Sequence, residues 1–260
     1  MHLFISPHLD DAPLSCGGLI HQLTQRGEAV TMLTVMAGDA PSPLPQSELI
    51  DLIHTRWGVG DNPPIARRQE DECAAQVLGA AIVHEKRQDC IYRVSRDGAA
   101  LYPTGAAIFA DILPDDPLDL REYAPFQTSQ TVTLYLPLAV GNHVDHQLVH
   151  RWAWGILSVR EQYSSLESVK FYEDYPYISW ETGETQRERQ VKALSAEFSV
   201  KAEIVTLSEA DTEAKLRAIA CYTSQISSFY TDFPTLEQNV RQTMLRTGDG
   251  VYAERYWTVL

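Results

Sequence analysis

Short apolar runs alternate with helix-like segments along this chain, and this alternation constrains the fold more than any other feature. Three of the runs indicate buried strands, at residues 2–6, 29–36 and 131–138. Segments with helical apolar spacing follow the first strand over 14–27 and the second over 65–80. Apolar strands joined through helices indicate a parallel sheet that is covered on both faces. We therefore predict one α/β domain over residues 1–260, Rossmann-like, doubly wound and mostly parallel.

The other segments extend this pattern. A Gly-, Pro- and Ser-rich stretch over residues 37–64 precedes the helix at 65–80, with a short helix expected near 47–56. Helices are also expected at 104–113 and 211–226, and a loop that runs into a helix at 139–157. Shorter strands are expected at 81–83, 168–174 and 203–207. None of these stretches has the composition of an interdomain linker.

The charge balance argues against several kinds of partner. Asp and Glu number 35 and Lys and Arg number 21, which gives a formal net charge of −14. Such a chain offers little of the basic surface that binds nucleic acids or anionic lipids. The sequence holds no run of about 18 apolar residues that could span a bilayer. We expect a small-molecule substrate, no nucleic acid and no membrane, and the pattern favours no particular oligomeric state.

The cysteines are widely spaced and form no CxxC pair: they are Cys16, Cys73, Cys90 and Cys221. This spacing argues against a thiolate zinc site or a redox motif. A chain of this length can bury a core without disulfide bonds. The start MHLFISPHLDD lacks the basic region and long apolar region of a signal peptide. We therefore predict four reduced, mostly buried thiols in a cytoplasmic protein.

Polar side chains gather directly after the first predicted strand. His8, Asp10 and Asp11 follow residues 2–6, and the loops beyond the carboxyl ends of parallel strands form the ligand crevice of a doubly wound sheet. An imidazole and two carboxylates there can bind a divalent metal and leave one carboxylate as a base. The alternative is that Asp10 or Asp11 caps the following helix. The presence of all three residues together favours chemistry.

A second cluster follows the strand at 131–138. It contains His143, Asp145 and His146, with His150 beyond it. In a helix that begins near His143, spacings of three and four residues place these histidines on one face. The alternative is a helix N-terminus, where Asp145 is favoured by the helix dipole and the histidines lie on the surface. Gln147 follows His146, so this is not the HExxH motif of thermolysin-like zinc enzymes.

Together the two clusters predict a catalytic metal site. Two histidines and one aspartate would supply three ligands and leave a fourth position for water, as in catalytic zinc sites. The spacing alone leaves both His146 and His150 as ligands from the second cluster. Zn²⁺ is the expected metal, although imidazole and carboxylate ligands also accept Fe²⁺, Mn²⁺, Co²⁺ or Ni²⁺.

At these motifs the chain resembles the PIG-L/LmbE-like deacetylases, zinc-dependent enzymes that remove the N-acetyl group from N-acetylglucosamine-type substrates. The stretch 8-HLDDA-12 is similar to the family's His-Pro-Asp-Asp-Glu, and 143-HVDH-146 to its His-Pro-Asp-His. Softer similarity lies in 67-RRQE-70 with 78-LGA-80, in 222-YTSQ-225 and in 254-ERYW-257. The resemblance implies hydrolysis of an acetamide on a sugar or sugar conjugate, which gives acetate and an amino sugar.

The resemblance also implies which residues bind the metal and act as base. The metal ligands would be His8, Asp11 and His146. Asp10 would be the general base that takes the proton of the attacking water.

Three further roles follow from the same resemblance. His143 would stabilise the oxyanion or protonate the leaving amine, and Asp145 would orient or tune a neighbouring histidine. Arg67 would hold a sugar hydroxyl or a phosphate. An equal alternative for Arg67 is an exposed helical arginine that pairs with Glu70 or Asp71.

The chain departs from the family pattern at three positions. Ala12 replaces the family's Glu, and Leu9 and Val144 replace the two prolines. Ala12 lies outside the ligand set, so we expect metal binding to survive while details of substrate binding change. A catalytically silent sugar-binding or partner-binding module therefore stays open as an alternative, as does a hydrolase of another amide or of an ester.

Two remaining features carry less weight. The aromatic residues of 171–177 could stack on sugar rings, although such residues more often serve packing. A nucleotide-binding module is disfavoured, because Gly17 and Gly18 come too late after the first strand to form a GxGxxG turn.

Overall fold

The computed structural model describes residues 1–60 and 62–260. Among these residues, seven strands form one sheet in the order β3-β2-β1-β4-β5-β7-β6. The strands are β1 (His2–Ser6), β2 (Val30–Thr34), β3 (Ala81–His84), β4 (Val132–Pro137), β5 (Leu166–Tyr172), β6 (Val200–Thr206) and β7 (Ala253–Val259). Strands β1 to β5 pair in parallel, whereas β7 pairs antiparallel with β5 and β6. The predicted mostly parallel α/β fold is confirmed.

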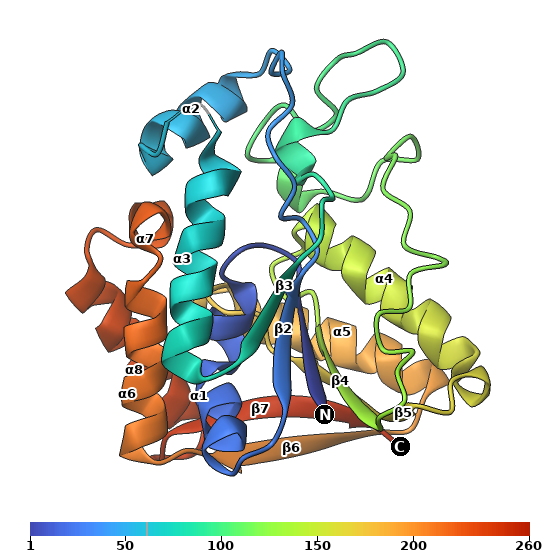
Figure 1. Ribbon diagram of the computed structural model, residues 1–260, viewed down its shortest axis with the longest axis vertical. Helices are drawn as coiled ribbons and strands as arrows, with labels where there is room; N and C mark the ends of the chain where they lie inside the picture. The colour runs from blue at the N-terminus through green and yellow to red at the C-terminus, as the bar shows by residue number, and fades with distance from the viewer. Residues whose placement is uncertain (61) are drawn as a thin grey trace.

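Helices cover both faces of this sheet (Figure 1). Helices α1 (Asp11–Gln25), α3 (Pro63–Leu78) and α6 (Glu209–Ala220) pack on one another on one side. Helices α4 (Val144–Ser158) and α5 (Gly183–Glu197) lie on the other side. Three more helices are α2 (Glu48–Trp57), α7 (Thr223–Phe229) and α8 (Phe233–Thr247). Short 3₁₀ turns lie at Cys90–Tyr92, Ala107–Phe109, Arg160–Gln162 and Tyr177–Ser179.

The pleat of the central strands divides the core into two layers. Phe4 of β1 packs among residues of α1, α3 and α6, whereas its neighbours Leu3 and Ile5 pack with residues of α4. All three side chains are buried. Because both faces are covered, β1 is apolar throughout its centre, as expected for a parallel sheet strand. The carboxyl ends of β1, β4 and β5 thus meet at one edge.

Some predicted helices differ from the observed ones. Residues 104–113 form only a 3₁₀ turn at Ala107–Phe109, and 211–226 is broken into α6 and α7 at Cys221 and Tyr222. Helix α5 was not predicted, since Leu194 and Gly183 are its only buried residues and no apolar stripe marks it. Among the described helices, none combines the length and apolar character that a bilayer crossing requires.

The prediction of four reduced thiols is wrong for two of them. Cys73 on α3 and Cys221 after α6 form a disulfide bond, with 5.9 Å between their Cα atoms. Cys16 and Cys90 are free and buried, as predicted. The pairing joins residues 148 positions apart, so only the packing of α3 against α6 brings the two thiols together.

Candidate metal centre

The first motif folds tightly around the end of β1. Ser6 Oγ accepts a hydrogen bond from the backbone N–H of Ala12 and donates one to the carbonyl of His8. The backbone N–H of His8 donates to Oδ2 of Asp11 at 2.7 Å. Among the described residues, the side chain of Asp10 makes no capping hydrogen bond to α1. The capping alternative is therefore wrong for Asp10, and this turn instead directs His8, Asp10 and Asp11 to the edge of the sheet.

The second motif follows β4 through a turn that needs glycine. Gly141 has φ +94°, and a Cβ there would lie 2.4 Å from the ring of Tyr177. After this turn, Nδ1 of His143 accepts a hydrogen bond from the backbone N–H of Asp145 at 3.3 Å, which caps α4. Asp145 and His146 then lie in the first turn of α4. The parallel pairing of β1 with β4 brings both motifs to the same edge.

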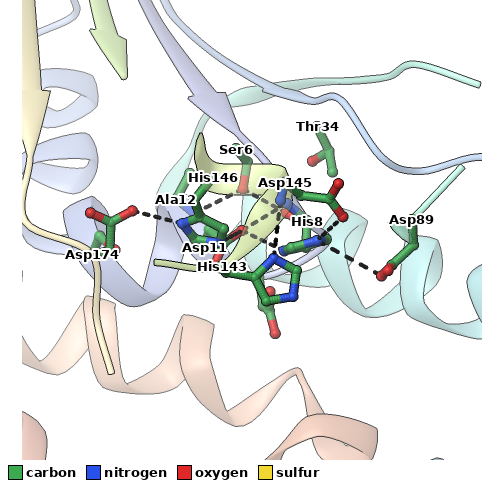
Figure 2. A network of polar contacts seen from close by, with 12 residues as sticks. Ser6, His8, Asp11, Ala12, Thr34, Asp89, His143, Asp145, His146 and Asp174 are labelled. Carbon is green, nitrogen blue, oxygen red and sulfur yellow. Dashed lines mark hydrogen bonds and ion pairs between the residues drawn. The ribbon is translucent and has the colours of Figure 1, made fainter. Parts of the chain in front are cut away.

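Three side chains from the two motifs converge on one point (Figure 2). Oδ2 of Asp11 lies 3.2 Å from Nδ1 of His8 and 3.3 Å from Nε2 of His146. Nε2 of His146 is fully buried and has no hydrogen-bond partner among the described residues. A buried nitrogen that faces a carboxylate and a second imidazole matches the donor set of a catalytic zinc site. These three residues therefore fit the metal that the sequence predicted.

Each of the two imidazoles has a carboxylate on its other nitrogen. Nδ1 of His146 lies 2.7 Å from Oδ1 of Asp174, and Nε2 of His8 lies 2.9 Å from Oδ2 of Asp145. Such partners fix a ring and its tautomer, and would leave the lone pair of the nitrogen that faces Asp11 for a metal ion. Burial lowers the pKa of His146, but Asp11 and Asp174 outweigh it and raise the pKa to about 9. The same carboxylates would stabilise a cation.

Asp10 lies beside this group without a helix or strand to hold it. Its carboxylate is buried and lies 3.6 Å from the guanidinium of Arg67 on α3. Burial, reinforced by Asp11 and opposed by Arg67, raises the pKa of Asp10 to about 7. A carboxylate with that pKa is suited to accept a proton near neutral pH.

Arg67 is buried, so the prediction's alternative of an exposed arginine paired with its own helix is wrong. Its guanidinium faces Asp10 and stacks over the ring of Trp57, with 4.6 Å between the guanidinium carbon and the ring centroid. Glu70 instead accepts hydrogen bonds from Thr223 and Ser224 of α7. Arg67 thereby joins the site to the end of α2.

His143 and His150 occupy different surroundings. His143 lies in the site, with its ring centroid 4.7 Å from that of His8, and burial lowers its pKa well below the ordinary value. His150 lies away from it, because Nδ1 faces the carbonyl of Pro137 at 2.9 Å and Nε2 accepts a hydrogen bond from Trp154. Both nitrogens of His150 are thus engaged elsewhere. Of the second motif, His146 and His143 remain, and ring nitrogens of these two residues and of His8 all lie within 4.8 Å of one another.

Sequence reasoning missed several residues of the site. Asp174 follows β5, and its position just beyond a strand end could have indicated it. Arg93 lies beyond the 3₁₀ turn at Cys90–Tyr92, and its guanidinium is 2.6 Å from Asp145. Asp89, just before that turn, lies 3.8 Å from His8. The segment 85–103 shows no periodicity that would place Arg93 or Asp89 there.

A cavity of about 360 Å³ opens onto the metal position. Such a volume is typical of small-molecule sites, which span roughly 300–1,000 Å³. Polar groups line one part of it: His8, Asp10, Asp11, Arg56, Arg67, Asp89, His143, Gln225 and Ser228. The other side chains are mostly apolar: Leu49, Leu52, Ile53, Trp57, Ile91, Ile108, Phe109, Tyr177, Trp180 and Phe229.

Comparisons with known proteins agree with this geometry. Residues 3–157 match the family described as PIG-L, GlcNAc-PI de-N-acetylase. A 2'-N-acetylparomamine deacetylase of Niallia circulans is 31% identical over 194 residues, which span 67% of this chain and 66% of that protein. A protein of the same name from Streptomyces fradiae is 28% identical over 98% of this chain and 80% of its own length.

Solved structures extend the likeness over the whole chain. The zinc-inhibited form of the teicoplanin deacetylase Orf2 superposes with a TM-score of 0.75 at 25% identity. That match covers 100% of this chain and 97% of the other. The family match spans both metal-site motifs, so the chain belongs to the PIG-L, or GlcNAc-PI de-N-acetylase, family.

Proposed function

We propose that this chain is a metal-dependent hydrolase that removes the N-acetyl group from an N-acetylglucosamine-type sugar or sugar conjugate. The observation that carries the proposal is the buried Nε2 of His146, which makes no hydrogen bond among the described residues and lies 3.3 Å from Asp11, with the buried carboxylate of Asp10 next to it. The relatives named as sugar and glycopeptide deacetylases support the substrate class. The products would be acetate and an amino sugar.

His8, Asp11 and His146 would hold the metal, and we propose Zn²⁺. Two imidazoles and one carboxylate leave a coordination position open, and Fe²⁺ could use the same donors. When bound, the ion would lower the pKa of a water molecule and polarise the acetyl carbonyl. Asp174 and Asp145 would keep the two imidazoles in the tautomer that presents a lone pair to the ion.

Asp10 and His143 would divide the proton transfers. Asp10, with a pKa raised by burial to about 7, would take the proton of the attacking water. His143 accepts the backbone N–H of Asp145 at Nδ1, so its neutral ring carries the proton on Nε2. That N–H would donate to the oxygen that becomes negative as the carbonyl is attacked. The proton held by Asp10 or His143 would then reach the leaving amine.

The test combines metal content with turnover. We expect wild-type protein to hold about one Zn²⁺ per chain and to release acetate and free amine in equal amounts from a methyl N-acetylglucosaminide. Asp11→Ala is expected to lose both the ion and the activity. Bound metal without release of acetate or amine from any N-acetyl sugar would leave the binding-module alternative. Amine release from other amides alone would favour the alternative hydrolase.

Two further expectations accompany this proposal. We propose that residues 1–260 act as one catalytic unit, because the strands of both ends of the sequence share one sheet. A cytoplasmic location also stays a prediction, and the Cys73–Cys221 disulfide opposes it, since such bonds persist mainly in oxidising compartments. Thiol titration of the denatured, unreduced protein measures whether the bond is present. Two reactive thiols, those of Cys16 and Cys90, indicate that the bond has formed, and four indicate a fully reduced protein.

A further inference from the structure

An apolar stripe leads away from the metal position along α2. Leu49, Ile53 and Trp57 are four residues apart, which places them on one face of the helix. All three line the cavity, as does Leu52 beside them. At 1.5 Å of rise per residue, the stripe from residue 49 to residue 57 is about 12 Å long.

The stripe begins at the catalytic groups. Asp10 faces the guanidinium of Arg67 at 3.6 Å, and that guanidinium stacks on Trp57. Trp57 is therefore separated from the proposed base by one side chain. From Trp57 the apolar surface continues over Ile53 to Leu49, so a molecule with its acetamide at the metal would reach this stripe with its distal part.

The opposite wall of the stripe is also largely uncharged. Helix α7 packs against α2 and lines the cavity with Gln225, Ser228 and Phe229. Arg56 is the one charged side chain that α2 and α7 together contribute to the lining among the described residues. Neither helix contributes a carboxylate to the lining, since Glu48 and Asp51 of α2 do not line the cavity, so this part of the wall offers no partner to a polycationic aglycone.

Large apolar side chains also remain exposed at this cavity. Leu52 is 55% exposed and Trp180 is 41% exposed, although both line it. Trp180 belongs to an aromatic group with Phe109 and Tyr177, whose ring centroids lie 4.9–5.9 Å apart. Exposed apolar surface that adjoins a polar site is typical of a ligand-binding surface. A bound apolar group would remove it from water.

We propose that this cavity binds an N-acetyl sugar whose aglycone is an apolar aryl or long alkyl group laid along Leu49, Leu52, Ile53 and Trp57. The inference rests on the proposed function and adds to it the chemistry of the group that the sugar carries. The sugar lies among the polar residues at the metal, and the aglycone lies between α2 and α7. A free sugar or a polycationic aminoglycoside leaves the stripe uncovered.

The experiment compares two glycosides that differ only in the aglycone. Octyl and methyl N-acetyl-β-glucosaminide are assayed for acetate release, with the octyl compound kept below its micelle concentration. We expect kcat/KM to be at least about tenfold higher for the octyl glycoside, because the additional CH₂ groups of its chain leave water when they are buried. The affinities of both glycosides are measured by calorimetry on Zn²⁺-loaded Asp10→Asn protein, in which turnover is expected to be about 10²–10⁴-fold slower.

A matched pair of variants locates the effect. Leu52→Gln changes an exposed leucine on the stripe and is expected to reduce the octyl-to-methyl ratio at least about threefold. Leu113→Gln changes a leucine of comparable exposure, 40%, that does not line this cavity. It is expected to leave the ratio unchanged.

The outcomes separate the inference from the function on which it rests. Equal kcat/KM and equal affinity for both glycosides would overturn the apolar subsite while deacetylation stands. A tenfold tighter binding of the octyl glycoside that depends on Leu52, without acetate release, would support the subsite and overturn the proposed reaction. Equal binding without acetate release would overturn both. An octyl preference that Leu52→Gln and Leu113→Gln reduce alike would also overturn the placement along α2.

Discussion

The guanidinium of Arg93 lies 2.6 Å from Oδ1 of Asp145, and both side chains are buried. Oδ2 of the same carboxylate accepts the backbone N–H of Cys90 and faces Nε2 of His8. Arg93 also pairs with Asp116 at 3.0 Å. Polar contacts thus connect His8 to Asp145, Asp145 to Arg93, and Arg93 to the loop that contains Asp116.

Replacement of Arg93 by methionine is expected to weaken the metal site. The change leaves Asp145 as a buried carboxylate without its cation, which costs about 3–5 kcal/mol of unfolding free energy. Because Asp145 then no longer holds His8 in place, Zn²⁺ affinity should fall about 10–100-fold. Urea denaturation measures the first effect and competition with a chelator the second.

Two further variants show whether Arg93 acts through Asp145. Arg121→Met removes an exposed arginine that pairs with Asp119 and should leave both quantities unchanged. In an Asp145→Asn background, Arg93→Met should have little further effect on Zn²⁺ affinity. An unchanged affinity in the single Arg93→Met variant would contradict the positioning role.

Asp10→Asn separates proton transfer from metal binding. Asp10 is not among the three residues that converge on the metal position, so the variant should retain about one Zn²⁺ per chain. An amide cannot accept the proton of the attacking water, so kcat should fall about 10²–10⁴-fold. Metal content is measured on the same preparation as acetate release. Retention of more than a tenth of the activity would rule out Asp10 as the base.

His150 gives the fold an acid-sensitive point outside the metal site. Burial lowers its pKa to about 4 in the folded protein, against about 6.5 in the unfolded chain. Below pH 6.5 the unfolded chain binds a proton that the folded protein does not, so the unfolding free energy falls with pH until about pH 4. Between pH 7 and pH 5 this loss is about 2 kcal/mol.

The measurement is urea denaturation of wild-type and His150→Asn proteins at both pH values. Asparagine can still donate to the carbonyl of Pro137 but does not titrate, so this variant should lose about 2 kcal/mol less on acidification. The same acid sensitivity in both proteins would show that His150 is not its source.

Gly141→Ala tests the close contact between the second motif and Tyr177. The new Cβ would lie 2.4 Å from the ring of Tyr177, so the ring would have to move. The alanine would also have to adopt a positive φ, which costs free energy by itself. Gly250→Ala is a matched control, since Gly250 has the same φ of +94° but nothing within 4 Å of its Cβ position. The positive φ alone costs about 1–3 kcal/mol.

Thermal and urea denaturation should therefore show a larger loss for Gly141→Ala than for Gly250→Ala. Zn²⁺ affinity should fall only in Gly141→Ala, because that turn positions His143 and His146. Equal stability losses would mean that the Tyr177 ring moves aside without cost.

The placement of the two motifs could be predicted from sequence because it depends on local patterns. His8 and Asp11 follow a short apolar strand, and parallel strands place their carboxyl ends at one edge. Spacing alone could not decide whether His146 or His150 faces the site, since both lie on the same helix, and only the family resemblance favoured His146. The difference arises from Pro137 and Trp154, which occupy the nitrogens of His150.

Other parts depend on packing that no local pattern reveals. Asp174 stands beside Glu173 just beyond a strand end, and its position there could indicate a site residue, but only the pairing of β4 with β5 shows that Asp174 is the carboxylate that reaches His146. Arg93 lies in a segment without periodicity, and its position depends on Asp145 and Asp116. Helix α5 could not be predicted from its sequence, because it is mostly exposed and has no apolar stripe.

The disulfide between Cys73 and Cys221 has a consequence for a chain that has been cut. Arg121 lies between the two cysteines in sequence, its side chain is 87% exposed, and residues 110–131 form neither helix nor strand. Trypsin that cleaves after Arg121 would separate His8 and Asp11 from His146 along the backbone. The bond would still tether the two fragments, which would migrate as one species on a gel until a reductant is added.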